Sequence, residues 1–328
     1  MTISSNFLLI KELKKINYKI VFLLLKFLAL TLTLTYLIST KKLTLASVDF
    51  IASRTGLFIS IIVIILLISI PLVSLRWAII LKNLESKKKG LIELYKITLI
   101  AQFFAIFMPG SATADLFKGY YLHKDNKNKT NIYFSILLDR IIGFYSIIFL
   151  IFISYACNYG LISSFEYISI FCNFLLISFI IFNLIIFLFK RKCLKILQSI
   201  KLKFISQKIQ KIIACIELIQ KTTLIKGFLL SILNQVTLIV IFLTINIPFN
   251  NLGIHDFLKI TFITPIGEIA SMIPLFPVGI GIGHISFEEL YLLFGYTNGA
   301  NIFNIFIVAK IIVGVIGGLT YIFYSRKS

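Results

Sequence analysis

The stretch FMPGSATADLFKGYYL, residues 107–122, interrupts a chain built mainly from long apolar runs. One such run reaches Pro109 and Gly110, and two charged residues, Asp115 and Lys118, follow shortly afterwards. Proline lacks a backbone N–H and clashes with the preceding turn, and glycine weakens a helix, so the pair predicts a helix break. The charges beyond it predict a second helix with a function of its own.

Composition determines the environment of this break. The chain has 328 residues, of which 59% are hydrophobic, and its mean hydropathy is +0.98. These values indicate an all-α polytopic membrane protein, because a soluble chain needs a larger polar surface, and no alternating pattern suggests a barrel. The net charge of +20 is assigned to cytoplasmic loops beside anionic lipid headgroups, not to nucleic-acid binding.

Apolar runs long enough to cross roughly 30 Å of hydrocarbon predict six full spans. They cover residues 20–40, 56–81, 131–157, 167–189, 223–247 and 301–323. Two further apolar regions, 91–122 and 257–295, are interrupted near the middle. The interruptions are Pro109 and Gly110 in the first, and Pro277, Gly279, Gly281 and Gly283 in the second.

The distribution of lysine and arginine orients these segments. With the basic loops placed in the cytoplasm, region 91–122 enters and leaves the membrane on the same side. After its break only about a dozen residues remain, roughly 18 Å of helix, which is too short to span. The sequence therefore predicts a re-entrant hairpin at 91–122 and a second one at 257–295 from the opposite side.

The two halves follow the same plan with opposite orientation. Each half, about 20–157 and about 167–323, contains three spans and one hairpin, which predicts an inverted-topology repeat in a single membrane domain. A connection at 190–222 has apolar residues at three- and four-residue spacing between lysines, which predicts an amphipathic helix on the inner leaflet. The alternative is that the similarity of the halves is a coincidence among apolar segments.

The hairpin breaks point to a binding cavity. Backbone that is not helical at membrane depth is tolerated only inside protein or beside a wet cavity. Helices that restart near 111–113 and 281–283 would direct their N–H groups and positive dipole ends into that cavity, which favours an anion such as a phosphate. The alternative is a pair of kinked helices without a ligand.

Ionisable residues inside the membrane are functional candidates, because each is costly unless paired. One expected pairing joins Asp139 to Lys118 and Arg140 to Asp115, and Arg76 either contacts the ligand or reaches the membrane surface. For each candidate the alternative role is a buried ion pair that holds helices together. The predicted substrate-binding residues are Arg76, Asp115, Lys118, Asp139, Arg140, Glu268, His284, Glu288 and Lys310.

No motif indicates catalysis or a cofactor. The chain has no phosphate-binding loop, no HExxH motif and no nucleophile elbow. The four cysteines lack metal-ligand spacing, and His284 with Glu288 would supply only two ligands. We therefore expect no catalytic residue, no metal and no cofactor.

Several motifs together resemble the lysylphosphatidylglycerol synthase transmembrane-region family, also called flippase-like proteins. They are MPGSATADLFKGYYL (108–122), LLDRIIGFYSIIFL (137–150) and PVGIGIGHISFEELYLLFG (277–295), supported by SLRWAIIL (74–81) and Lys310. The chain departs from the family pattern where Ala114 replaces a glycine, where Lys118 stands in place of arginine, and where His284 occupies the position of an acid.

The resemblance implies movement of a phospholipid or a lipid-linked glycan or polyprenyl phosphate between leaflets, without the soluble aminoacyl-transferase domain of the founding members. In that interpretation the chain is not an enzyme, its partner is an anionic or phosphate-bearing lipid, and a homodimer stays open. The expected location is the bacterial inner membrane, with both termini in the cytoplasm. Two other functions are considered: a membrane-embedded lipid transferase and a membrane scaffold that transports nothing.

Overall fold

The structure is a computed structural model, and it describes residues 31, 35, 38, 39, 42, 44–84, 89–107, 111–123, 129–163, 165–181, 215–250, 253–273 and 278–325. The predicted span at 20–40 lies almost entirely outside the described residues. So do residues 190–214 of the predicted amphipathic connection, and Pro109, Gly110 and Pro277 of the predicted breaks.

The described residues form helices and no strand, which confirms an all-α polytopic membrane protein. Within them, four helices are long and apolar enough to cross a membrane: Thr55–Leu84, Lys129–Cys157, Lys221–Asn246 and Gly299–Phe323. Each overlaps a span predicted from the sequence. A shorter apolar helix, Glu166–Ile181, covers the start of the predicted span at 167–189.

The first of these spans follows the short helix α2 (Ala46–Ser53) and combines α3 (Thr55–Ile64), a π-helical turn η1 (Ile65–Ser69) and α4 (Ile70–Leu84). A π-helical turn disturbs the regular hydrogen-bond ladder. Here the Tyr95 hydroxyl donates to the Leu66 carbonyl within that turn, at 3.1 Å. The disturbed backbone is therefore satisfied from a neighbouring helix.

The first interrupted region forms two helices that pack against each other, α5 (Leu91–Phe107) and α6 (Ser111–His123). Phe104 of α5 and Phe117 of α6 stack with their ring centroids 3.7 Å apart. Helix α6 has 13 residues, about 20 Å of helix, which is less than the thickness of the hydrocarbon. The restart of the helix at Ser111 agrees with the prediction from the sequence.

The second interrupted region also forms a packed helix pair, α12 (Ile254–Ser271) and α13 (Ile282–Leu293). Helix α12 contains Pro265, which cannot donate to the carbonyl of Thr261 four residues earlier. The Ser154 hydroxyl on α7 (Lys129–Cys157) donates to that carbonyl at 3.0 Å. The proline is thus accommodated because a neighbouring helix replaces the missing bond.

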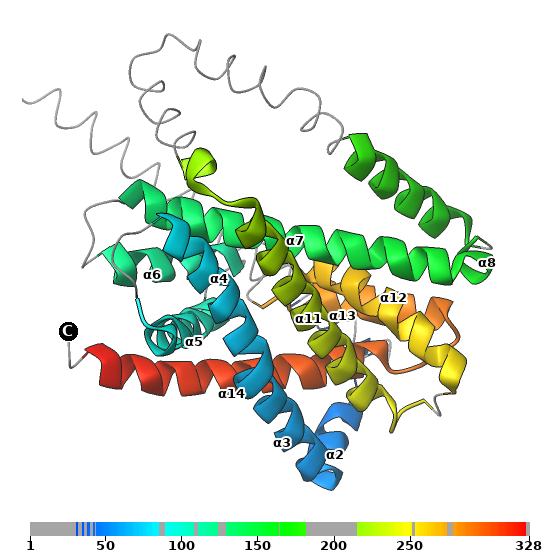
Figure 1. Cartoon of the computed structure of the whole chain (residues 1–328). Coiled ribbons are helices and arrows are strands. Elements are labelled where there is room, and N and C mark those ends of the chain that lie inside the picture. Colours follow the sequence, from blue (N-terminus) through cyan, green and yellow to red (C-terminus); the bar gives the residue numbers. More distant parts are fainter. Residues whose placement is uncertain are drawn as a thin grey trace, which may run out of the picture.

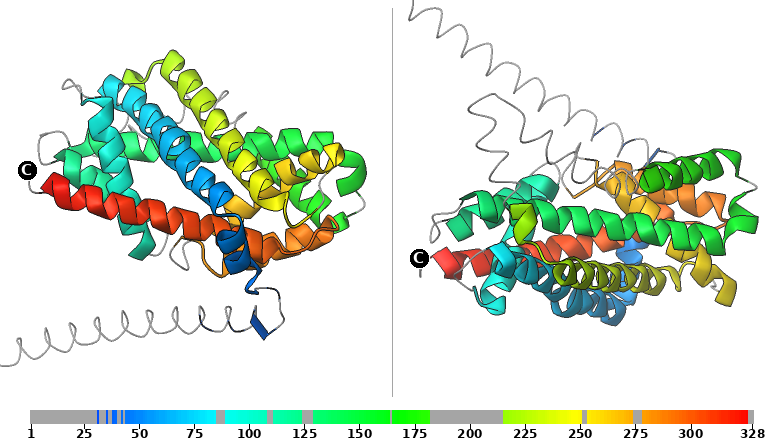
Figure 2. Two further views of the ribbon diagram at one scale, coloured as in Figure 1. Left: turned by 90° about the horizontal axis from the view of Figure 1, so that it is seen from below. Right: turned by 45° about the horizontal axis from the view of Figure 1, so that its top comes forward.

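Corresponding helices in the two halves of the chain make nearly the same contacts. In the first half, α4, α5, α6 and α7 pack in sequence, and α11 (Lys221–Asn246), α12, α13 and α14 (Gly299–Ser325) do the same in the second. Across the halves, α5 packs on α14 and α12 packs on α7. Helices α4 and α11 lie side by side between them (Figures 1 and 2). An internal repeat would produce such matching contacts in its two halves, and the inverted orientation of the halves stays a prediction.

Glycines allow the close contact between α5 and α14. Gly314, Gly317 and Gly318 lie at three- and four-residue spacing on α14 and face α5. A Cβ atom on Gly317 would collide with the backbone carbonyl of Leu99, and one on Gly318 would lie 2.7 Å from the ring of Phe103. Small residues at such contacts let helix backbones approach closely in membranes.

We predict that Gly317→Ala destabilises the protein by about 1–3 kcal/mol, because the added methyl group meets backbone that cannot rotate away. Thermal unfolding in detergent, followed by the fluorescence of the chain's single tryptophan, measures the change. Gly56→Ala is the matched control, since nothing lies within 4 Å of the new methyl group. A melting temperature of Gly317→Ala equal to that of the parent would contradict the packing described here.

Candidate functional site

A cavity of about 820 Å³ lies among α4, α5, α6, α7, α11 and α12. The helix Glu166–Ile181 contributes further lining through the apolar residues Leu175 and Phe179 and the polar residue Ser178. Six of the predicted site residues line this cavity: Arg76, Asp115, Lys118, Asp139, Arg140 and Glu268. The structure therefore brings most of the candidate charges together around one space.

The first charge cluster of the cavity consists of Asp115, Lys118 and Arg140. Asp115 is buried and accepts a hydrogen bond from the Arg140 Nε, as predicted, and the Lys118 Nζ lies 3.1 Å from its other carboxylate oxygen. The Lys118 ammonium also lies 5.4 Å from the centre of the Trp77 ring, a cation–π contact. Two cations therefore share one carboxylate in the wall of this cavity, and Glu268 lines the same cavity from α12.

The second charge cluster corrects two expectations. Asp139 pairs with Arg76 and not with Lys118: the Arg76 Nε and Nη2 donate to its two carboxylate oxygens at 2.6 and 3.0 Å. A third donor of Arg76, Nη1, reaches the Ser231 hydroxyl on α11 at 2.8 Å. Arg76 is 8% exposed, so it does not extend to the membrane surface. Since its charge is fully compensated by a bidentate carboxylate, this cluster holds α4, α7 and α11 together.

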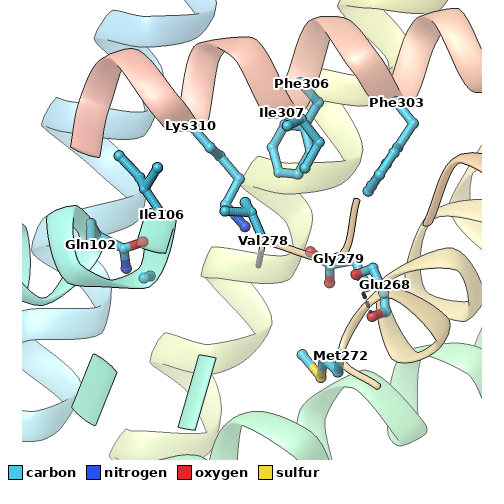
Figure 3. Close-up of a pocket in the computed structure, with 12 residues that line it drawn as sticks. Gln102, Ile106, Glu268, Met272, Val278, Gly279, Phe303, Phe306, Ile307 and Lys310 are labelled. Carbon is cyan, nitrogen blue, oxygen red and sulfur yellow. Dashed lines mark hydrogen bonds between the residues drawn. The ribbon is translucent and has the colours of Figure 1, made fainter. Parts of the chain in front are cut away.

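A smaller pocket of about 130 Å³ adjoins the large cavity. Glu268 of α12 and Lys310 of α14 line it, together with Gln102 of α5 and the loop residues Val278 and Gly279. Figure 3 shows Lys310 and Glu268 reaching toward this loop from two different helices. The pocket therefore joins one predicted acid and one predicted base from the second half of the chain.

The loop before α13 has an unusual backbone. Gly279 has a φ of 78°, and the preceding Val278 has a φ of 56°, which is rare for a β-branched residue. A Cβ atom on Gly279 would lie 2.6 Å from the Ser271 carbonyl, so the loop passes directly against the end of α12. Glycine is needed here both for the backbone conformation and for the close approach.

His284 and Glu288, also predicted to bind substrate, line neither cavity. The Gly281 N–H donates to the His284 Nδ1 at 3.3 Å, and the His284 Nε2 contacts the Asn304 side chain at 3.3 Å. The Glu288 carboxylate accepts a hydrogen bond from the Ala300 N–H at 2.8 Å, in the first turn of α14. Both residues satisfy helix ends, because those N–H groups have no partner within their own helix.

Sequence reasoning missed the uncharged polar residues of the site. Gln102 lines both cavities, Gln235 lines the larger one, and Ser231 binds Arg76. Gln235 also lies near the Glu268 side chain. Their signal was present in the sequence as amides and hydroxyls inside apolar spans, but hydroxyls in helices often bond to their own backbone, and this makes the signal weak.

Among the described residues, no group of three or more histidine, cysteine or acidic side chains is arranged to hold a metal ion. The described cysteines Cys157, Cys172 and Cys215 are free thiols.

The geometry can now be compared with known proteins. Residues 18–323 match the model of the family described as the lysylphosphatidylglycerol synthase TM region. The chain belongs to this family. Comparison with curated proteins and with solved structures gave no match.

In this member of the lysylphosphatidylglycerol synthase TM-region family, the matched residues include both helix pairs and every candidate site residue. The family assignment supports a membrane function related to lipids.

We predict that Asp139→Asn destabilises the protein by about 3–5 kcal/mol, because it leaves the buried Arg76 without its carboxylate partner. The double variant Arg76→Met/Asp139→Leu should recover most of this loss, since it removes both charges. Unfolding in detergent of the parent, Arg76→Met, Asp139→Leu and the double variant gives the coupling energy between the two sites. Additive effects of the single changes would contradict the assigned pairing.

We also predict that Glu288→Gln lowers stability by about 1 kcal/mol by weakening the charged hydrogen bond to the start of α14. Binding of lipid, measured per folded molecule, should stay at the parental level because Glu288 lies outside both cavities. A selective loss of lipid binding with unchanged stability would instead assign Glu288 to the binding site.

Proposed function

We propose that this protein moves a phospholipid or a lipid-linked phosphate between membrane leaflets, with the phosphate held beside Lys118 and Arg140. The observation that carries the proposal is the position of Lys118 and Arg140 beside one carboxylate, Asp115, in the wall of a large cavity of a membrane protein. Cations that line a cavity inside a membrane protein mark candidate sites for an anionic ligand.

The surroundings of the cluster suit a lipid. Ile141 and Phe144 line the large cavity, and both are about half exposed among the described residues, at 51% and 47%. A headgroup at the cluster would therefore adjoin apolar side chains on the outer surface of the helices. Acyl chains could remain in the hydrocarbon while the phosphate is held inside, as translocation requires.

The proposed movement depends on the topology inferred from the sequence. In this proposal α5–α6 and α12–α13 are re-entrant hairpins that enter from opposite faces, and the halves rock against each other as an inverted repeat. The two breaks in the described helices and the exchangeable packing of the halves support it. The proposal places both termini in the cytoplasm of a bacterium and assigns the chain to the inner membrane.

In this proposal the protein moves the lipid without changing its covalent structure. The purified protein in vesicles is therefore expected to move a fluorescent phosphatidylglycerol that chromatography recovers unchanged. A reducing agent that bleaches only the outer leaflet measures the rate of movement. Conversion of the lipid to a new product would favour a transferase instead.

Lys118→Gln and Arg140→Gln are expected to slow translocation about tenfold or more, since each removes a hydrogen bond to the phosphate worth about 1.5–3 kcal/mol. In both variants Asp115 keeps one cationic partner, so the fold should persist.

Lys42→Gln is the control for this experiment, because Lys42 pairs with Glu289 on α13, away from both cavities. Parental rates in both cluster variants would overturn the proposal. So would an equal slowing in the control, which would attribute the effect to a general loss of positive charge.

A further inference from the structure

The large cavity and the small pocket share a wall. Gln102, Ala105, Glu268 and Met272 line both spaces. Glu268 therefore stands between the Asp115 cluster on one side and Lys310 on the other. A ligand in either space would therefore lie next to this carboxylate.

Glu268 has an incomplete set of partners. Its Oε2 atom is buried and accepts no hydrogen bond from any residue that the structure describes. Gln235 and Lys310 both lie close enough to act on the side chain electrostatically. No direct ion pair joins Glu268 and Lys310 among the described residues, although both line the same pocket. Two opposite charges thus face a shared space without contact.

The separation of these charges has a consequence for ligands. A phosphate in the pocket would be attracted to Lys310 and repelled by an ionised Glu268 at short range. Such repulsion is strong where little water screens it. One proton on Glu268 removes the repulsion and leaves the attraction. The Oε2 atom without a hydrogen bond is also a position where a carboxylic acid could carry that proton.

In the proposed function, the first binding site for the lipid phosphate, called the first station here, is the Asp115 cluster. On the basis of that function, we propose that the small pocket is a second binding site, or second station, for the same phosphate and that Glu268 takes up one proton when the phosphate occupies it. A pocket of about 130 Å³ has room for a phosphate-sized group, given that one water in the liquid takes about 30 Å³.

A metal ion suits this pocket less well than a phosphate with a proton. Glu268 is the one carboxylate among the described lining residues, whereas calcium takes about six to eight oxygen ligands. Any cation would also be repelled by the Lys310 ammonium. The phosphate, in contrast, is already expected in the adjoining cavity.

Other charged and titratable groups lie on and around α12. On α13, which packs on α12, His284 and Glu288 bind Asn304 and Ala300. Glu289 of the same helix pairs with Lys42, and the buried Tyr291 hydroxyl has no hydrogen-bond partner among the described residues. From α11 the side chain is the neutral Gln235. Helix α12 itself carries Asp256 and Lys259, paired with each other near its start. The remaining groups that share a cavity with Glu268 are Arg76, Asp115, Lys118, Asp139, Arg140, Tyr145 and Lys310.

The test is the pH dependence of phosphatidylglycerol translocation in vesicles. Its phosphodiester stays ionised between mildly acidic and mildly alkaline pH, so the lipid itself does not titrate. We expect the parental rate to fall as pH rises, by up to about tenfold per pH unit if one proton is required. Glu268→Gln should remove this dependence, because glutamine has no titrating carboxylate.

Binding at the first station serves as the internal reference. Trp77 lies beside Lys118, and its fluorescence should report, in the parent and in every variant, whether lipid binds there. Glu289→Gln makes the same chemical change at a residue outside both cavities and should keep the parental pH profile. Lys310→Gln is the second variant: it should slow translocation about tenfold and also flatten the profile.

The outcomes separate the two proposals. A parental rate that is independent of pH, or a Glu268→Gln profile as steep as the parental one, overturns the proton site while translocation itself stands. Lipid that neither binds nor moves overturns the proposed function, and the second station with it. If vesicles instead release trapped dimethyl phosphate without moving lipid, the pocket takes a soluble phosphate and the lipid assignment is wrong.

Discussion

The structure depends on one constraint: a charge buried in an apolar environment needs a partner of opposite charge. Arg76 and Asp139 meet this requirement completely, with two hydrogen bonds between them and a third to Ser231. That cluster joins three helices from both halves of the chain. Because it is neutral and saturated, it acts as the framework against which the other charges are positioned.

The other charges that line the two cavities are arranged differently from this framework. Asp115 is shared by two cations, while Glu268 and Lys310 face one pocket without forming an ion pair. Ionisable groups that line a cavity inside a membrane protein are candidates for contact with a charged ligand. The proposed ligand is therefore placed beside these groups and not beside Arg76 and Asp139.

Buried backbone N–H and C=O groups also need partners, in their case hydrogen-bond partners. Broken helices expose N–H and C=O groups, and the described structure satisfies many of them from neighbouring helices. The Ser154 hydroxyl serves the carbonyl left free by Pro265, Tyr95 serves the π-helical turn, and Glu288 serves the start of α14. Irregular backbone is therefore possible beside the cavities because adjacent spans supply the missing hydrogen bonds.

Hydropathy, the Pro109–Gly110 and PVGIGIG breaks and the motifs were enough to establish the helical membrane class, the two interrupted regions and the family. These patterns are formed by residues that lie close together in the sequence, so they can be recognised without knowledge of the tertiary structure. The sequence did not determine which charged residues form ion pairs. The pair of Arg140 with Asp115 was predicted correctly, but the predicted pair of Asp139 with Lys118 was wrong, because Asp139 pairs with Arg76. Likewise the sequence did not show that His284 and Glu288, predicted to bind substrate, accept hydrogen bonds from the N–H groups of helix ends. Which charges meet depends on how distant helices rotate and cross, and packing over the whole molecule decides that.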